Sequence, residues 1–262
     1  MANMTSSVSA SQVAGELASA TFEEIPALVE HYREDPRQQV IKACERALKR
    51  HAKELAERER VNDMYELMHE LGGDGVVVGV DEVGRGSVAG PLTVCAVCLP
   101  MEPRVWGIND SKKLTPARRE LLSVKIAEVA TAIGFCHIAP KDIDEMGMAR
   151  AIRAAVAGAV ADTGLEPDCV LMDGNPLGAV LNERDVVKGD AKIACIAAAS
   201  IMAKVTRDEM MVEYDAEYPE YHLAESKGYA SPEHIEAIRK HGLCPLHRVS
   251  FCGNFLQTER LF

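Results

Sequence analysis

A glycine-rich break at residues 72–75 separates two segments that differ in hydrophobic period. Before the break, apolar residues across 22–71 recur every three or four positions, which is the period of an amphipathic helix. After it, short apolar runs rich in β-branched residues begin at residue 76, and such runs are typical of buried strands. The sequence therefore predicts a helical N-terminal extension, residues 1–71, followed by a larger domain, residues 76–262.

The larger segment alternates between strand and helix patterns. Strands are expected at 76–80, 92–99, 133–138 and 169–172, and helices at 116 to about 131, 141–162, 190 to about 218, and from 232 onward. In this reading Asp190 is the N-cap of its helix. This alternation predicts an α/β fold. The apolar run 193–203 lies between lysines and is far shorter than the ~20 residues of a membrane span, so we expect a buried helix there.

Composition limits the possible functions. Hydrophobic residues make up 47% and charged residues 26% of the 262 positions, as in globular proteins. The N-terminus lacks the pattern of a secretory signal, and eight cysteines are scattered along the chain, so we expect reduced thiols, a cytoplasmic location and no membrane partner. Cys95 and Cys98 have zinc-site spacing but no second pair at a matching interval. The net charge of −11 means that any nucleic-acid binding requires a local basic patch.

Carboxylates stand at three junctions of the predicted elements. Asp81 and Glu82 follow the first strand, Asp173 ends another, and Asp190 precedes the long alanine-rich helix. Each alone is also explained by an exposed turn, an Asx turn or a helix cap. Adjacent residues on a strand face opposite sides, so Asp81 and Glu82 can share a site only if the strand ends or bulges there. Together, the four predict an oxygen-only site for Mg²⁺ or Mn²⁺.

Glycine, basic and aromatic residues surround these positions. Gly84 and Gly86 would let the backbone approach a sugar or phosphate closely, and the spacing fits neither a dinucleotide fingerprint nor a phosphate loop. Tyr229, beside Gly228, is suited to stacking on a sugar or base, or to packing in an ordinary turn. Each basic residue taken alone is more simply explained as a surface side chain; the residues are Lys112, Lys113, Arg118, Arg119, Lys188, Lys192, Lys204 and Arg207.

Seven short motifs follow one another along the chain between residues 79 and 251. They are Gly79-Val80-Asp81-Glu82-Val83-Gly84-Arg85-Gly86-x-x-Ala89-Gly90-Pro91, Asn109-Asp110-Ser111-Lys112-Lys113-Leu114, Met172-Asp173-Gly174-Asn175, Val187-Lys188-Gly189-Asp190, Ala198-Ala199-Ser200-Ile201-x-Ala203-Lys204-Val205-Thr206-Arg207-Asp208, Lys227-Gly228-Tyr229 and His247-Arg248-x-Ser250-Phe251. From residue 76 to 251 the chain resembles bacterial ribonuclease HII, a family of the RNase H-like superfamily.

The resemblance implies an RNase H-like mixed sheet flanked by helices, with an N-terminal helical extension and a C-terminal helical segment. It implies an endonuclease that cuts the RNA strand of RNA–DNA hybrids and incises 5′ of single ribonucleotides in duplex DNA, as in ribonucleotide excision during DNA replication and repair. Asp81, Glu82, Asp173 and Asp190 match the catalytic carboxylates, and the first three match metal ligands for Mn²⁺ or Mg²⁺. Two cations would act on the attacking water and the leaving oxygen, giving a 5′-phosphate and a 3′-hydroxyl.

The same resemblance assigns substrate contacts. Gly84, Arg85, Gly86 and Tyr229 match the groups that read the 2′-hydroxyl at an RNA–DNA junction, and the expected phosphate contacts are Lys112, Lys204 and Arg207. The chain departs from the family pattern at three positions. None of them removes a carboxylate, so these departures bear on the fine geometry of the site and on its metal preference rather than on the reaction. Ser87 stands where Pro is common, Ala191 where Ser is common, and Ser226 where His or Asn often occurs.

The two ends of the chain suggest further partners. Gln257, Leu261 and Phe262 resemble the short segments with which bacterial replication proteins dock on the sliding clamp, and the more ordinary explanation is a frayed or packed C-terminus. Basic residues of the N-terminal extension either grip the duplex or form a solvated helix face. We expect a monomer. Two other functions stay open, a non-catalytic RNase H-like module that binds hybrids and a metal-dependent phosphatase or nucleotide hydrolase.

Overall fold

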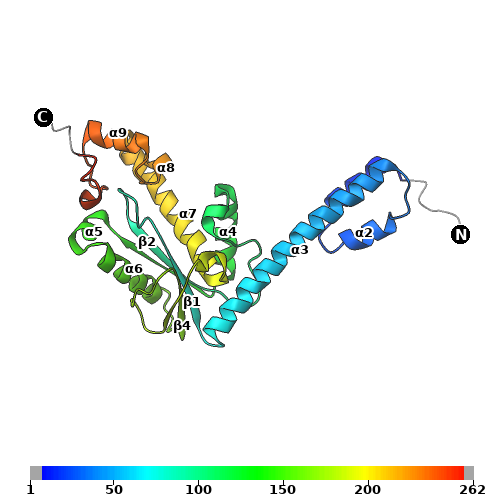
Figure 1. Ribbon diagram of the computed structural model, residues 1–262, viewed down its shortest axis with the longest axis horizontal. Coiled ribbons are helices and arrows are strands. Elements are labelled where there is room, and N and C mark those ends of the chain that lie inside the picture. The colour runs from blue at the N-terminus through cyan, green and yellow to red at the C-terminus, as the bar shows by residue number, and fades with distance from the viewer. Residues whose placement is uncertain (1–7, 257–262) are drawn as a thin grey trace. The chain divides into compact units, whose positions relative to one another are not determined.

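A computed structural model describes residues 8–256 (Figure 1). The chain divides into two compact units with the boundary between Asn62 and Asp63, and each is described by itself. Across 8–256, no helix combines the length and apolar character needed to cross a membrane.

The first unit is helical, as predicted. It contains α1 (Ala10–Ser19), α2 (Ile25–His31) and the first part of α3 (Gln38–Gly72), which pack around a small core that includes Val13 and Leu17. Helix α1 was not predicted, because the apolar period recognised in the sequence begins only at residue 22. This helix begins with a capping box, in which Ser9 and Gln12 each accept a hydrogen bond from the other's backbone N–H.

A mixed five-stranded sheet forms the centre of the second unit. Its strands are β1 (Val77–Val83), β2 (Leu92–Cys98), β3 (Ala132–Ile138), β4 (Cys169–Asp173) and β5 (Glu183–Val186). The order is β3-β2-β1-β4-β5, with β1–β2 and β2–β3 antiparallel and β1–β4 and β4–β5 parallel. The first four strands were predicted. The edge strand β5 was missed because its Glu-Arg-Asp-Val sequence is polar and incompletely buried.

Helices cover both faces of this sheet, which confirms the predicted fold class (Figure 1). One core joins β1, β2 and β4 to α6, and α7 packs against β1 and β2 on the other face. The helices of this unit are α4 (Pro116–Val129), α5 (Pro140–Met146), α6 (Met148–Asp162), α7 (Ala194–Glu217), α8 (Leu223–Ser226) and α9 (Pro232–His241), and the last turns of α3 also belong here. Residues 194–201 of α7 are buried, as expected.

Candidate active site

Two of the predicted carboxylates lie next to each other on parallel strands. Val80 on β1 is in register with Met172 on β4, so Asp81 and Asp173 follow at neighbouring positions on the same face. Helix α7 packs close to that face, because a Cβ added to Gly79 would lie 2.3 Å from the carbonyl carbon of Cys195. A glycine is therefore needed at position 79 for α7 to pack this close to β1.

Asp81 is a buried carboxylate, with 9% of the residue exposed. It accepts hydrogen bonds from the backbone N–H of Glu82 (2.8 Å) and from Ser200 on α7. The Ser200 hydroxyl in turn lies 2.9 Å from that of Ser111. Burial, together with the charges of Glu82 and Asp173, raises the pKa of Asp81 to about 8 despite these bonds. The folded protein thus holds a carboxyl whose ionised form is unfavourable without a compensating positive charge.

The sequence interpretation that Asp81 and Glu82 can share a site only where the strand ends or bulges is wrong, because the strand does neither at Glu82, yet the charge of Glu82 acts on Asp81 and that of Asp173 acts on Glu82. Strand β1 keeps regular pairing with β2 through Val83, so Asp81 and Glu82 lie on opposite faces. Glu82 is nevertheless close enough to the site for Asp173 to affect it: burial raises its pKa, the Asp173 charge adds to that rise, and Arg85 opposes it. The Arg85 guanidinium lies 3.5 Å from the Glu82 carboxylate.

Asp190 joins the group from a different element than predicted. It lies in a 3₁₀ turn, Gly189–Ala191, and Ile193 rather than Asp190 occupies the N-cap position of α7. The turn is attached to β4, because Asp173 accepts a 2.7 Å hydrogen bond from the backbone N–H of Gly189. Burial raises the pKa of Asp190, and the charge of Asp173 adds to the rise. Asp190 therefore lies close enough to the other carboxylates for their negative charge to oppose its ionisation.

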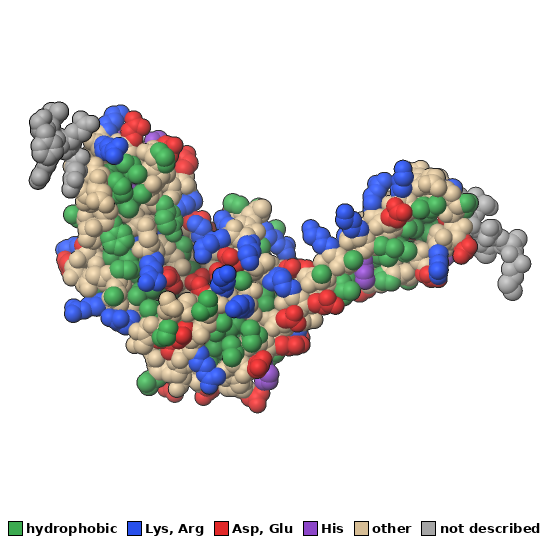
Figure 2. Space-filling model, viewed as in Figure 1, with side chains coloured by type: hydrophobic (Ala, Val, Ile, Leu, Met, Phe, Trp, Pro, Cys, Tyr) green, Lys and Arg blue, Asp and Glu red, His purple; other side chains and the backbone are tan. Residues whose placement is uncertain are grey.

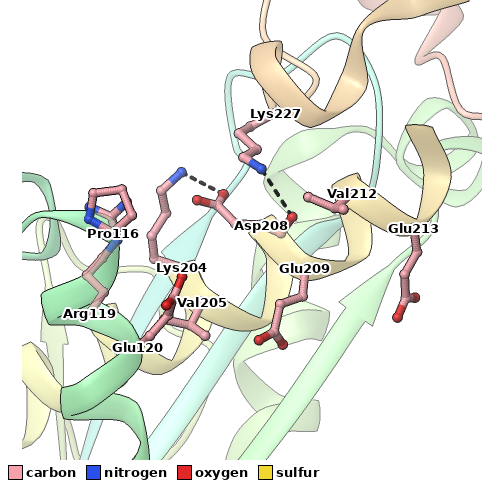
Figure 3. Close-up of a pocket in the computed structure, with 10 residues that line it drawn as sticks. All are labelled: Pro116, Arg119, Glu120, Lys204, Val205, Asp208, Glu209, Val212, Glu213 and Lys227. Atoms are coloured by element: carbon pink, nitrogen blue, oxygen red, sulfur yellow. Dashed lines mark hydrogen bonds and ion pairs between the residues drawn. The ribbon is translucent and has the colours of Figure 1, made fainter. Parts of the chain in front are cut away.

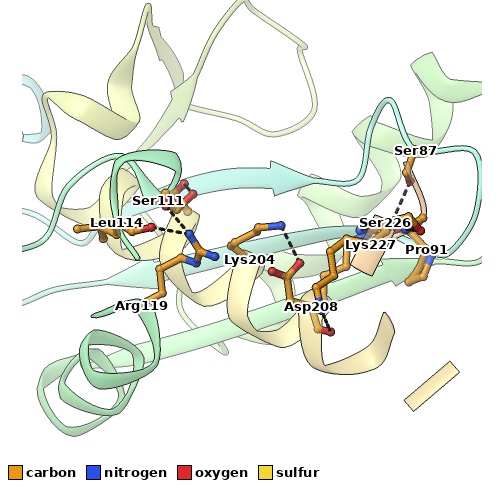
Figure 4. A network of polar contacts seen from close by, with 12 residues as sticks. Ser87, Pro91, Ser111, Leu114, Arg119, Lys204, Asp208, Ser226 and Lys227 are labelled. Atoms are coloured by element: carbon orange, nitrogen blue, oxygen red, sulfur yellow. Dashed lines mark hydrogen bonds and ion pairs between the residues drawn. The ribbon is translucent and has the colours of Figure 1, made fainter. Parts of the chain in front are cut away.

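Lys112 provides positive charge beside this group. Burial opposes its ionisation, but the field of the surrounding carboxylates outweighs burial and raises its pKa; those carboxylates are Asp81, Asp190, Asp110 and Asp173. Its 3₁₀ turn, Ser111–Lys113, is held by Arg119, which donates to the carbonyl oxygens of Ser111 (2.9 Å) and Leu114 (2.7 Å) (Figure 4). The structure thus brings Lys112 to the carboxylates.

The donor set has the chemistry that hard divalent cations prefer. Within residues 8–256, no three His, Cys, Asp or Glu side chains form a ready-made cluster for a metal ion. The carboxylates offer only oxygen ligands, and burial plus mutual repulsion raises the pKa of Asp81, Glu82 and Asp190. A cation such as Mg²⁺ or Mn²⁺ would neutralise that repulsion, so the residues present fit one.

The glycines of the Gly-Arg-Gly segment have different environments. Gly84 is buried with φ of +84°, and an added Cβ would lie 2.3 Å from Arg207 Nε. Gly86 is exposed, and nothing lies within 4 Å of a Cβ added there. The fold therefore requires glycine at 84, whereas at 86 the open space on the outer side of the backbone is available to a ligand.

Arg207 is not a phosphate contact, which corrects the prediction. It is completely buried. Its guanidinium donates to the carbonyl oxygens of Pro91 (2.9 Å), Ala89 (3.1 Å) and Lys227 (2.8 Å) and to the hydroxyl of Ser87 (2.9 Å). Arg207 therefore ties the loop that follows Gly84 to the turn that carries Tyr229.

A second buried arginine, Arg248, supports the same loop and was missed as a site residue. It donates to the carbonyl oxygens of Gly90 (2.9 and 3.1 Å) and Arg85 (3.2 Å). Burial, with the nearby Arg207 charge, lowers the pKa of Arg248 to about 10. The only signal in the sequence was the motif His247-Arg248-x-Ser250-Phe251, which identifies the family but not this contact.

Tyr229 lies in a turn that is hydrogen-bonded to the glycine loop. The backbone N–H groups of Val88 and Ala89 both donate to the carbonyl oxygen of Gly228 (2.9 and 3.1 Å), and 40% of Tyr229 is exposed. The Arg207 guanidinium lies 5.8 Å from the centre of its ring. The structure therefore brings together an exposed aromatic ring and the exposed backbone at Gly86.

Lys204 lies on α7, in a cavity of about 590 Å³ that Pro116 and Arg119 of α4 and Lys227 also line (Figure 3). Its ammonium group is 2.7 Å from the Asp208 carboxylate. Acidic and basic side chains lie together on the surface beside α4 and α7 (Figure 2). The contact of Lys204 with a substrate phosphate stays a prediction. In it, the phosphate would compete with the Asp208 carboxylate for the Lys204 ammonium group.

Comparisons with known proteins agree with this architecture. A model of the family "Ribonuclease HII" matches residues 78–254, and one of the "Ribonuclease HII N-terminal domain" matches residues 9–71. A ribonuclease HII from Ruminiclostridium cellulolyticum is 44% identical over 204 residues, 77% of this chain and 80% of that protein.

Two solved structures share the fold. The ribonuclease H2 of Pyrococcus horikoshii OT3 has a TM-score of 0.59 and 27% identity over 70% of this chain and 99% of its own. A structure described as the PCNA:RNase HII complex from Archaeoglobus fulgidus has a TM-score of 0.60 and 25% identity over 71% of this chain and 98% of its own. The chain belongs to the ribonuclease HII family.

Proposed function

We propose that this chain hydrolyses the RNA strand of RNA–DNA hybrids and incises duplex DNA on the 5′ side of single ribonucleotides. One observation carries the proposal: the acidic group at the ends of β1 and β4 lies next to a loop and a turn that expose Gly86 and Tyr229. Chemistry and recognition of a junction are thereby combined in one region of the second unit.

In this proposal, Asp81, Glu82 and Asp173 hold the divalent cations, and Asp190 completes the catalytic group. When bound, Mg²⁺ or Mn²⁺ would activate the attacking water and stabilise the leaving 3′ oxygen, so that the products carry a 5′-phosphate and a 3′-hydroxyl. Lys112 attracts the phosphate backbone toward the carboxylates, which would otherwise repel it. The hydrogen bond from Ser200 keeps the Asp81 carboxylate in a fixed orientation.

Substrate recognition uses the backbone more than side-chain charge. The open space over Gly86 lets the peptide groups of Gly84, Arg85 and Gly86 approach a 2′-hydroxyl, and Tyr229 stacks on the adjoining nucleotide. A 2′-hydroxyl both donates and accepts hydrogen bonds, so exposed backbone groups can distinguish RNA from DNA at this position. Lys204 is a further phosphate contact in this proposal.

The proposal is tested with a DNA duplex that contains one ribonucleotide. We expect incision on its 5′ side with Mg²⁺ or Mn²⁺, loss of incision when a chelator removes the metal, and no cutting of an all-DNA duplex. Intact duplex that the folded protein still binds would instead support the non-catalytic hybrid-binding module. Rapid turnover of free nucleotides without incision would support the phosphatase or nucleotide hydrolase.

We also propose that the C-terminal tail binds a sliding clamp. Gln257, Leu261 and Phe262, the predicted contacts, lie outside the described residues. The Archaeoglobus fulgidus relative supports the idea, since its structure is described as a complex with PCNA. Removing Leu261 and Phe262 is expected to weaken binding to the clamp of the source organism at least 10-fold, as measured by surface plasmon resonance. Equal affinity of the truncated and full-length proteins would exclude this tail as the docking segment.

The division into an extension, residues 1–71, and a catalytic domain, residues 76–262, stays a proposal, as does a monomeric state. In the first unit, Arg37 pairs with Asp35 and Arg58 with Glu54. These ion pairs support the solvated-face interpretation for those two arginines, while a grip on the duplex would rest on other basic residues of the extension.

A further inference from the structure

Two buried histidines form a chain of hydrogen bonds that ends at Tyr229. His234 and His247 are 0% and 3% exposed, and their Nε2 atoms lie 3.1 Å apart. The backbone N–H of Cys244 points at His247 Nδ1 (3.0 Å), and His234 Nδ1 lies 2.9 Å from the carbonyl oxygen of Tyr229. The chain therefore connects the loop after α9 to the proposed recognition residue.

The shortest contact of His247 Nδ1, 3.0 Å to the Cys244 backbone N–H, selects one arrangement of protons over the 3.4 Å contact of the same atom with the Cys244 carbonyl oxygen. A backbone N–H can only donate, so His247 Nδ1 accepts from Cys244, and the proton of the neutral imidazole is on Nε2. That Nε2–H donates to His234 Nε2, which leaves the His234 proton on Nδ1. His234 then donates to the carbonyl oxygen of Tyr229. Each step fixes the tautomer of the next ring.

The surroundings keep both rings neutral. The ring of Tyr221 contacts His247 edge-on, with centroids 4.8 Å apart, and also lies near His234. Burial lowers the pKa of both histidines, and with the neighbouring His234 it lowers that of His247 to about 4. At neutral pH each ring therefore has a single proton to donate.

The last bond of the chain acts on the residue that carries the exposed aromatic ring. Consecutive carbonyl oxygens of the Lys227–Tyr229 turn accept from different elements: Lys227 from Arg207, Gly228 from Val88 and Ala89, and Tyr229 from His234 and the Ser231 N–H. Lys227 and Gly228 have positive φ angles of 51° and 77°. Such a turn needs external contacts to hold one conformation.

We infer that His234, with its proton placed by His247, is a positioning residue for Tyr229. It fixes the backbone from which the ring projects toward the nucleotide next to the incised bond. His234 is buried and does not touch substrate itself. The inference rests on the proposed role of Tyr229 in recognition.

A matched pair of substitutions separates positioning from packing. In His234→Asn the side-chain amide can occupy the place of Nδ1 and still donate to Tyr229. In His234→Gln the amide reaches the place of Nε2, so the bond to His247 can form but the Tyr229 carbonyl loses its side-chain donor. Both are neutral and polar, so a role confined to packing would affect them similarly.

We expect both Tyr229→Ala and His234→Gln to lower kcat on the single-ribonucleotide duplex about 10-fold or more, with KM changed much less. His234→Asn should stay within about 3-fold of wild type. The double variant Tyr229→Ala/His234→Gln should be no slower than Tyr229→Ala alone, because the histidine acts through the tyrosine. The melting temperature of each variant, compared with that of wild type, shows whether a decrease in kcat comes from unfolding.

The outcomes distinguish this inference from the proposed function. If Tyr229→Ala incises the duplex as fast as wild type, the recognition role of Tyr229 fails. If Tyr229→Ala is slow but His234→Gln and His234→Asn have equal kcat, the positioning role fails while the proposed function stands. The same conclusion follows if the fold decrease in kcat of the double variant equals the product of the two single-variant decreases.

Discussion

Asp81→Asn is expected to lower the incision rate by about 10³-fold or more while making the metal-free protein more stable. The loss of activity follows because asparagine keeps the size of the side chain but removes the charge that would hold a divalent cation. It also replaces one of the two carboxylate oxygens with an N–H₂ group, which cannot act as a ligand.

The gain in stability follows from the burial of Asp81. Burial and the neighbouring charges of Glu82 and Asp173 raise its pKa to about 8. A carboxyl whose folded pKa exceeds its unfolded value stabilises the folded state at low pH, and that contribution is lost as the pH rises toward the folded pKa. Between the ordinary pKa of 3.8 and pH 7, each pH unit costs the metal-free folded protein about 1.4 kcal/mol, so at pH 7 it carries a penalty of about 4 kcal/mol that the neutral amide avoids.

The measurement combines incision kinetics with thermal unfolding, with chelator and with Mn²⁺. Added metal should raise the melting temperature of wild type, because it binds the folded state, and should raise that of Asp81→Asn less. Asp142→Asn, which makes the same chemical change at an exposed position on α5, should leave rate and melting temperature nearly unchanged. An Asp81→Asn protein that incises at a rate near wild type would remove Asp81 from the catalytic group.

The features that were predictable from sequence are those encoded by short segments. The run Val76–Val80 and the buried residues of β4 are apolar and flanked by turn residues, so both strands and the carboxylates at their ends could be placed from local signals. Parallel pairing of β1 with β4 then brings Asp81 and Asp173 together. The sequence thus predicted that Asp81 and Asp173 each stand at the end of a strand, and the parallel pairing in the structure places the two side by side.

Other features depend on contacts that no local pattern shows. Arg207 has the spacing of a surface basic residue, yet its donors reach Pro91, which is 116 residues away in sequence, and none of its surface is exposed. Asp190 has the sequence context of a helix cap, but the bond from Gly189 to Asp173 places it in a separate turn before the helix. Tertiary hydrogen bonds thus decide whether the Arg207 side chain is buried or exposed, and whether Asp190 lies in a turn or at the helix cap.

Arg207→Met is expected to destabilise the protein by about 3–5 kcal/mol and to slow incision beyond the loss of folded protein. Methionine fills much of the same volume but supplies no donors, so the carbonyl oxygens of Pro91, Ala89 and Lys227 lose their partner in a buried site. Each unsatisfied buried acceptor costs about 1–3 kcal/mol, and partial rearrangement keeps the total below the full sum.

The matched control is Lys204→Met, one turn earlier on the same helix. The Lys204 ammonium makes a partly exposed i,i+4 ion pair with Asp208, so its removal should cost less than about 1 kcal/mol in chemical denaturation. A cost for Arg207→Met as small as that of Lys204→Met would show that the glycine loop and the Tyr229 turn are held without Arg207. A loop that has lost its buried support should no longer hold Gly86 and Tyr229 in one arrangement, so we expect incision by the folded fraction to slow. A large loss of stability together with normal incision by the folded fraction would show instead that Arg207 contributes to stability alone.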